Sequence, residues 1–176
     1  MGCRNSIRTA RLRLDPVSWT DLEDVVRLKA TSGVTGRLAG GVCNRALSER
    51  DMMTDLMTWG REGVGMFAVR LHGRFIGLAG VQPSTTMPDH HEMQFALVPQ
   101  AHDSTLPREA ASTALAFAHE GGVERIIAYA KMGDIVARQV FGGAGMHVCA
   151  TPQETGRTDI LLYQSTRPRM EQTRLH

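Results

Sequence analysis

The sequence contains no run of about 18 consecutive apolar residues, the length that marks a membrane-spanning helix. It has no block of like charges either, because its 20 Lys and Arg residues are scattered among 18 Asp and Glu residues. A formal net charge of +2 on 176 residues gives no basic surface of the kind that binds nucleic acid. We therefore expect neither a membrane protein nor a nucleic-acid-binding protein.

Cysteine is scarce: the chain has only Cys3, Cys43 and Cys149, with no Cys-x-x-Cys spacing. An odd number of widely separated cysteines does not predict a disulfide framework and indicates free thiols in a reducing compartment. The start of the sequence also has no apolar segment typical of a secretion signal. These features predict a cytoplasmic location.

Short motifs of several other enzyme classes are missing. The chain has no Walker phosphate-binding loop, no Gly-x-Ser-x-Gly nucleophile motif and no Cys/His spacing typical of zinc sites. His90, His91 and Glu92 are adjacent, but neighbouring residues of an extended chain point to alternating sides and do not easily share one ion. We therefore predict no metal site.

Hydrophobic periodicity predicts a mixed α/β protein. Strands are expected at 7–14, 66–71, 74–81, 92–98, 125–130, 146–150 and 159–164. Helices are expected to begin at Thr20, Ser48, Pro107 and Asp134, and residues 32–46 are expected to form a loop. This order predicts one domain over residues 1–176, with a partly parallel sheet that helices cover on both faces.

Four strings in this order resemble the GNAT superfamily, and most closely its ribosomal-protein-alanine N-acetyltransferase (Rim-type) branch. TARLRL at 9–14 is similar to that branch's opening T-x-R-L-x-L strand, and FIGLAG at 75–80 to its I-G-x-x-G strand. EMQFALVP at 92–99 is similar to the strand that ends in Pro, and GAGM at 143–146 to the turn after the last helix. The resemblance covers a core of about residues 7–166.

The resemblance implies the GNAT acyl-CoA N-acyltransferase fold and acetyl-CoA as the co-substrate. Its acetyl group would pass to a primary amine of a small molecule or of a peptide N-terminus, and a homodimer is an alternative to a monomer. The cofactor's pyrophosphate would bind backbone N–H groups between the strand at 92–98 and the next helix, where the helix N-terminus favours anions. The resemblance implies cofactor contacts from Phe95, Ala96, Leu97, Val98, Gln100, Ala101, His102, Asp103, Ser104, Thr105, Arg108, Asp134 and Arg138.

The cofactor loop departs from the family pattern Q/R-x-x-G-x-G/A and is degenerate in this respect. Gln100 matches the first position, but Asp103 and Thr105 stand where glycines are expected. Thr105 adds bulk, and the charge of Asp103 would repel a phosphate by about 1 kcal/mol at an effective dielectric near 20, which Arg108 would offset. Two interpretations follow: an active N-acetyltransferase, or a GNAT-like domain that binds a ligand or partner without turnover.

Acetyl transfer needs a base for the amine and an acid for the leaving thiolate. Glu92, at the head of its strand, is the predicted base, because burial raises a carboxyl pKa towards neutrality. His90 and His91 are alternatives, since an imidazole titrates near neutral pH. The resemblance implies a tyrosine acid in or near the fourth predicted helix, which contains none here; Tyr129 on the preceding strand is therefore the predicted acid, and Tyr163, the only other tyrosine, is the alternative.

Overall fold

The protein is described by a computed structural model, which covers residues 6–35, 42–101, 105–151, 154, 156 and 158–168. The strands are β1 (Ile7–Arg8), β2 (Leu12–Pro16), β3 (Met66–Leu71), β4 (Arg74–Pro83), β5 (His91–Leu97), β6 (Arg125–Lys131), β7 (His147–Ala150) and β8 (Ile160–Thr166). The α-helices are α1 (Leu22–Lys29), α2 (Ser32–Thr35), α3 (Arg45–Glu62), α4 (Leu106–Glu120) and α5 (Ile135–Gly143).

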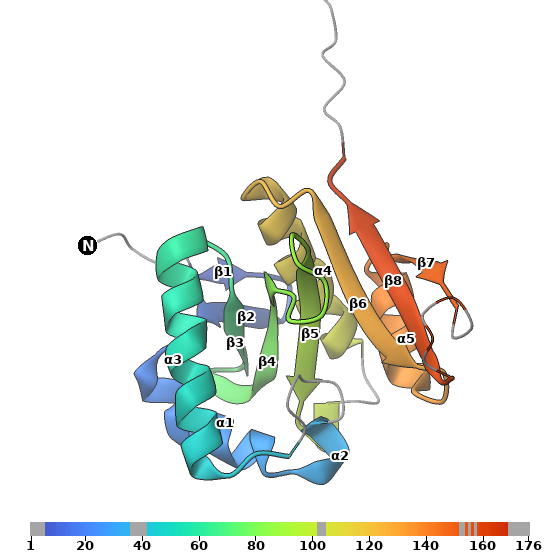
Figure 1. The fold of residues 1–176 in the computed structure, drawn as a ribbon. Coiled ribbons are helices and arrows are strands. Elements are labelled where there is room, and N and C mark those ends of the chain that lie inside the picture. Colours follow the sequence, from blue (N-terminus) through green and yellow to red (C-terminus); the bar gives the residue numbers. More distant parts are fainter. Residues whose placement is uncertain are drawn as a thin grey trace, which may run out of the picture.

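The described strands form one eight-stranded sheet in the order β1-β2-β3-β4-β5-β6-β8-β7. Only β5 and β6 pair in parallel, and the other neighbours are antiparallel. Helices α1 and α3 lie over one face of the sheet, and α4 and α5 lie over the other (Figure 1). The predicted fold class, a mixed α/β sheet with helices on both faces, is therefore confirmed.

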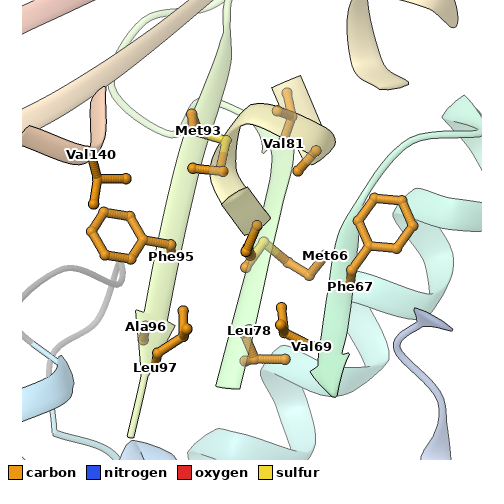
Figure 2. Close-up of a cluster of buried hydrophobic side chains, with 14 of the residues drawn as sticks. Met66, Phe67, Val69, Leu78, Val81, Met93, Phe95, Ala96, Leu97 and Val140 are labelled. Atoms are coloured by element: carbon orange, nitrogen blue, oxygen red, sulfur yellow. The ribbon is translucent and has the colours of Figure 1, made fainter. Parts of the chain in front are cut away.

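Aromatic side chains fill the face of the sheet under α4 and α5. Phe67 on β3 packs edge-on against Phe117 of α4, with ring centroids 5.3 Å apart. Phe95 on β5 packs in the same way against Phe141 of α5, at 5.6 Å, and points towards Val140 (Figure 2). Odd-numbered residues of β3 and β5 thus face α4 and α5.

The neighbouring even-numbered residues face the opposite side, because side chains alternate along a strand. Met66, Gly80 and Gln94 stand in one register row across β3, β4 and β5, and Gln82 stands opposite Glu92 in the next row. This second face carries polar side chains among apolar ones. This face lies under α1 and α3 (Figure 1) and carries Glu92, the predicted catalytic base.

Two predictions near the start of the chain are wrong in detail. The single strand predicted at 7–14 is two short strands, because the chain turns at Thr9, whose N–H donates to the Leu12 carbonyl at 2.9 Å. The capping box predicted at Thr20 lies two residues earlier. Asp21 accepts from the Ser18 N–H at 2.9 Å, and a short 3-10 turn precedes α1.

The second helix also begins before its predicted start at Ser48. Asn44 accepts a hydrogen bond from the Leu47 N–H at 2.9 Å, and asparagine is a strong helix N-cap. The helix α3 therefore begins at Arg45, three residues early. The predicted loop at 32–46 contains the short helix α2 in its first part.

Candidate active site

Strands β5 and β6 pair over only two residues before they diverge. Their parallel ladder joins His91 to Ile126 and Glu92 to Ile127. Beyond Glu92, β5 continues beside β4, whereas β6 continues beside β8 (Figure 1). Glu92 therefore stands where the two strands begin to separate.

The strand residues predicted to contact the cofactor lie along this diverging part of β5. Phe95, Ala96 and Leu97 have side chains that are fully buried, at 0% exposure. Any contact that they make with a ligand must therefore come from their backbones. Val98 is half-buried, and its N–H donates to the Ile76 carbonyl at 2.8 Å, which ties the end of the strand to β4.

Glu92 is half-buried and lies on the sheet face under α1 and α3. Its Oε2 accepts a hydrogen bond from Ser84 Oγ at 3.3 Å, and its Oε1 accepts one from Gln94 Nε2 at 3.3 Å. The contact with Ser84 is longer than the roughly 2.5–3.0 Å usual for O–H···O bonds. The carboxylate is therefore oriented but not tightly held by these two side chains.

Tyr129 lies on the same sheet face as Glu92, because it is two residues beyond Ile127, the register partner of Glu92. Its hydroxyl is 2.9 Å from Thr86 Oγ1, which in turn is 3.2 Å from Ser84 Oγ. The two predicted catalytic side chains are thus joined by a hydroxyl relay, in which Ser84 and Thr86 bridge Glu92 and Tyr129. The sequence prediction missed this relay, although its loop contains consecutive hydroxyl residues.

The alternative catalytic residues are engaged elsewhere. His91 points to the face opposite its neighbour, and its Nε2 lies 2.7 Å from Glu62 Oε2. His90 is half-buried at the end of the β4–β5 loop, and its Nδ1 lies 3.3 Å from the Pro88 carbonyl oxygen. Tyr163 is only 6% exposed, and its ring lies 5.6 Å from that of Phe141, so it packs in the core.

The predicted phosphate loop is described only at its ends. Gln100 and Ala101 form a short 3-10 turn after β5, in which Gln100 is exposed and Ala101 is buried. His102, Asp103 and Ser104 lie outside the described residues. The predicted role of the Asp103 charge therefore stays a prediction.

Thr105 is the N-cap residue of α4, but its side chain does not cap the helix. Its hydroxyl instead accepts a hydrogen bond from Arg11 Nη2 at 2.6 Å. Arg11 also pairs with Glu109 of α4 at 2.6 Å, and Thr9 donates to the same carboxylate. Burial raises the pKa of Glu109, but the hydrogen bonds from Thr9 and Arg11 outweigh it and leave the pKa below its ordinary value. The opening strand motif thus anchors the start of α4.

The remaining predicted cofactor residues bond to the backbone around α5. Arg108 Nε donates to a carbonyl in the last turn of α5 at 3.1 Å. Asp134 is the N-cap of α5, since its Oδ1 accepts from a first-turn N–H at 3.0 Å. Arg138 donates to a carbonyl of the β6–α5 turn at 3.0 Å. Each side chain has a structural role, and its predicted contact with the cofactor stays a prediction.

A family model supports the resemblance in the sequence: the acetyltransferase (GNAT) domain matches residues 11–147. The chain belongs to the GNAT acetyltransferase family. GNAT acetyltransferases use acetyl-CoA. No curated protein sequence matches the chain.

Solved structures of other acetyltransferases share the fold of this GNAT chain. An acetyltransferase from Agrobacterium tumefaciens is 21% identical, with a TM-score of 0.75 over 92% of this chain and 94% of that one. yncA from Salmonella typhimurium, solved with acetyl-CoA, is 12% identical, with a TM-score of 0.71 over 92% and 96%. The ribosomal-protein-S5-alanine acetyltransferase from Vibrio fischeri is 11% identical, with a TM-score of 0.70 over 93% and 97%.

A pocket of about 150 Å³ on the Glu92 side of the sheet was not predicted. It lies between α1, α3 and the strands, and contains Lys29, Asp51 and Asp55. Lys29 Nζ pairs with Asp51 Oδ2 at 2.8 Å. Burial raises the pKa of Asp55 to about 7, Lys29 lowers it, and Asp51 raises it. The only sequence signal was the i, i+4 spacing of the two aspartates on one helix.

Among the described residues, no group of three or more His, Cys, Asp or Glu side chains is arranged to hold a metal ion. None of the described helices is both long and apolar enough to span a bilayer.

Proposed function

We propose that the chain is an active N-acetyltransferase that transfers the acetyl group of acetyl-CoA to a primary amine of a small molecule or of a peptide N-terminus. The observation that carries this proposal is the hydroxyl relay from Glu92 to Tyr129, where β5 and β6 diverge. If Glu92 were only a surface residue and Tyr129 only packed in the sheet, we would not expect a chain of hydroxyl groups to connect them.

Acetyl-CoA supplies the thioester: the amine nitrogen forms the new C–N bond, the C–S bond breaks, and the thiolate leaves. We propose that the β5 backbone from Phe95 to Leu97 donates an N–H group to the carbonyl oxygen, since the Val98 N–H is already bonded to the Ile76 carbonyl. The loop from Gln100 to Thr105 and the start of α4 hold the pyrophosphate, because a helix N-terminus favours anions. Arg108, Asp134 and Arg138 complete the cofactor surface.

The two catalytic side chains divide the proton transfers. Glu92 accepts the proton of the attacking amine, directly or through water, and Tyr129 donates a proton to the departing thiolate. Ser84 and Thr86 then pass the proton held by Glu92 to the tyrosinate. The relay restores both groups without a net change in charge.

The Rim-type branch is a finer proposal. It rests on the opening strand motif at 9–14 and on a fold shared with the ribosomal-protein-S5-alanine acetyltransferase at 11% identity. A peptide N-terminus is the acceptor that this branch favours. We further propose a single domain over 1–176, a cytoplasmic location, and either a monomer or a homodimer, which sedimentation would distinguish.

A thermal-shift titration with acetyl-CoA tests whether the altered loop still binds. At 100 times its dissociation constant, a ligand of the folded state adds about 2.7 kcal/mol, which raises Tm by roughly 5–10 °C in a domain of this size. Acetyl-pantetheine, which lacks the nucleotide and its pyrophosphate, is the control and should give a smaller shift. No shift at millimolar acetyl-CoA would refute the proposal.

Thiol release with a panel of small amines and N-terminal peptides then tests turnover. The proposal predicts release with at least one amine. A full Tm shift without release from any acceptor would favour the alternative, a GNAT domain that binds its ligand without turnover.

A further inference from the structure

The pocket beneath α1 and α3 carries one more acidic group than basic groups. Lys29 is 6% exposed, and its ammonium is committed to Asp51 at 2.8 Å. The strands contribute the neutral side chains of Gln82 and Gln94 to the wall. Asp55 is therefore left without a matching positive charge.

Asp55 is an unpartnered acid inside this pocket. It is only 8% exposed, lines the cavity, and makes no hydrogen bond to any described residue. A buried carboxylate without a hydrogen-bond partner is costly, and a cation or hydrogen-bond donor that enters the pocket would stabilise it. A cationic ligand would supply the positive charge that Asp55 lacks in this pocket.

The pocket adjoins the candidate catalytic base. Gln94, in its wall, donates to Glu92 at 3.3 Å, and Gln82, also in its wall, is the register partner of Glu92. Its volume of about 150 Å³ resembles that of a cavity which holds one benzene, or roughly six non-hydrogen atoms. A short unbranched chain with an ammonium at each end fits both the volume of the pocket and the unmatched charge of Asp55.

We propose that this pocket makes the enzyme selective for small diamine acceptors, in which one amino group reacts beside Glu92 while the second, as an ammonium, pairs with Asp55. This inference rests on the proposed function. It deepens that function by naming the class of acceptor: aliphatic diamines of about six non-hydrogen atoms, in preference to monoamines of the same length.

Binding of the second ammonium should displace a proton from Asp55. The charged groups that face Asp55 are Lys29 from α1 and Asp51 from its own helix, and the β4 and β5 side of the pocket is neutral up to Glu92. With the pKa of Asp55 near 7, the carboxylate fraction rises about tenfold between pH 6 and pH 8. Diamine affinity should rise by about the same factor.

Isothermal titration calorimetry without acetyl-CoA tests the proposal independently of catalysis. The titrants are 1,4-diaminobutane and 1-aminobutane, each at pH 6 and pH 8. The proteins are the wild type, Asp55→Asn, and as the control Glu49→Gln, whose carboxylate on α3 pairs with Arg45 at 2.9 Å and does not line the pocket. We expect the wild type and Glu49→Gln to bind the diamine at least tenfold more tightly than the monoamine at pH 8, and about tenfold more tightly at pH 8 than at pH 6.

Asp55→Asn should lose both differences. Equal affinities of the wild type for the two amines would overturn the proposal, as would an unchanged preference in a folded Asp55→Asn protein. The wild-type pH dependence decides the matter even if that variant does not fold. A Tm shift and thiol release with other amines, but no diamine preference, would sink this inference and leave the proposed function intact.

Discussion

At the scale of single residues, the proposed chemistry depends on four oxygen-bearing side chains. Glu92 and Tyr129 come from two strands, and Ser84 and Thr86 come from the loop between β4 and β5. Glu92 was predicted from its place at the end of a strand, and Tyr129 from the resemblance to a family that often uses a tyrosine as the acid; both roles stay predictions. The bridging hydroxyls could not be predicted, since Thr86 and Tyr129 are 43 residues apart and meet only through the sheet.

Replacement of Tyr129 by Phe should lower kcat by about 10²-fold or more, because it removes the proposed acid. Thr86→Val keeps the acid but breaks the relay, and should have a smaller effect. Thiol release at saturating acetyl-CoA measures both, and the acetyl-CoA Tm shift should be unchanged in each. A Tyr129→Phe enzyme with the wild-type rate would remove this residue from the mechanism.

Asp55→Asn should change the pH dependence of stability. The pKa of Asp55 is raised from an ordinary 3.8 to about 7, so its protonated form stabilises the fold fully below pH 3.8 and this contribution is lost as pH rises to about 7. The variant should match the wild type near pH 4 and exceed it at pH 8, on the order of a few kcal/mol. Tm measured across this range checks the trend, and a parallel loss of stability in the variant would contradict it.

At the scale of elements, α4 is held at its start by residues nearly a hundred positions away. Glu109 accepts from Thr9 and from the Arg11 backbone and side chain. The resemblance identified the TARLRL motif, but its sequence alone did not reveal that the Thr and Arg bind this helix. The anchor positions the helix whose N-terminus we propose for the pyrophosphate.

Glu109→Ala should destabilise the protein by about 1–2 kcal/mol, because several charge-assisted hydrogen bonds are lost at a half-buried site. The pKa of Glu109 lies below its ordinary 4.5, so the stabilisation persists at neutral pH and is lost as pH falls below that value. Chemical unfolding at pH 7 measures the difference. Arg27→Ala removes an exposed ion pair, should cost under about 0.5 kcal/mol, and serves as the control. Equal losses of stability in the two variants would contradict the claim that Glu109 anchors α4.

The glycine at position 80, in the FIGLAG strand at 75–80, has a steric explanation. A Cβ at Gly80 would lie 2.4 Å from the Gly65 carbonyl oxygen and 2.5 Å from Met66 Cα, so the backbones of β3 and β4 would have to move. Gly80→Ala should therefore cost about 1–3 kcal/mol. Gly60→Ala on α3 meets nothing within 4 Å and should instead stabilise by up to about 1 kcal/mol. Urea unfolding compares them, and similar effects in the two variants would contradict the steric account.

Element types were more predictable than their ends. The strand at 66–71 is confirmed, and His72 and Gly73, which lie between it and the next predicted strand, form the turn with positive φ, at 49° and 79°. The helix starts at Thr20 and Ser48 are wrong, because Ser18 with Asp21 and Asn44 make the actual cap contacts. Several residues near each start could cap, and tertiary packing decides between them.

At the scale of the whole molecule, periodicity predicts the strands but not their neighbours. In the sheet, β8 lies between β6 and β7, and β5 separates from β6 after Glu92. Neither feature can be predicted from the alternation of apolar and polar residues along a strand. The family resemblance implied the fold as a whole, and the structure supplies this strand order. The acidic pocket could not be predicted from the sequence, because Asp55 becomes buried only when α1 and α3 pack over the sheet.

The most direct measurement is thiol release by the wild type and by Glu92→Gln at saturating acetyl-CoA, with each amine of the panel. We predict release by the wild type and a loss of about 10²-fold or more in the variant, with the same acetyl-CoA Tm shift in both proteins. Equal rates in the two proteins, or no release by a wild type that binds acetyl-CoA, would contradict the account.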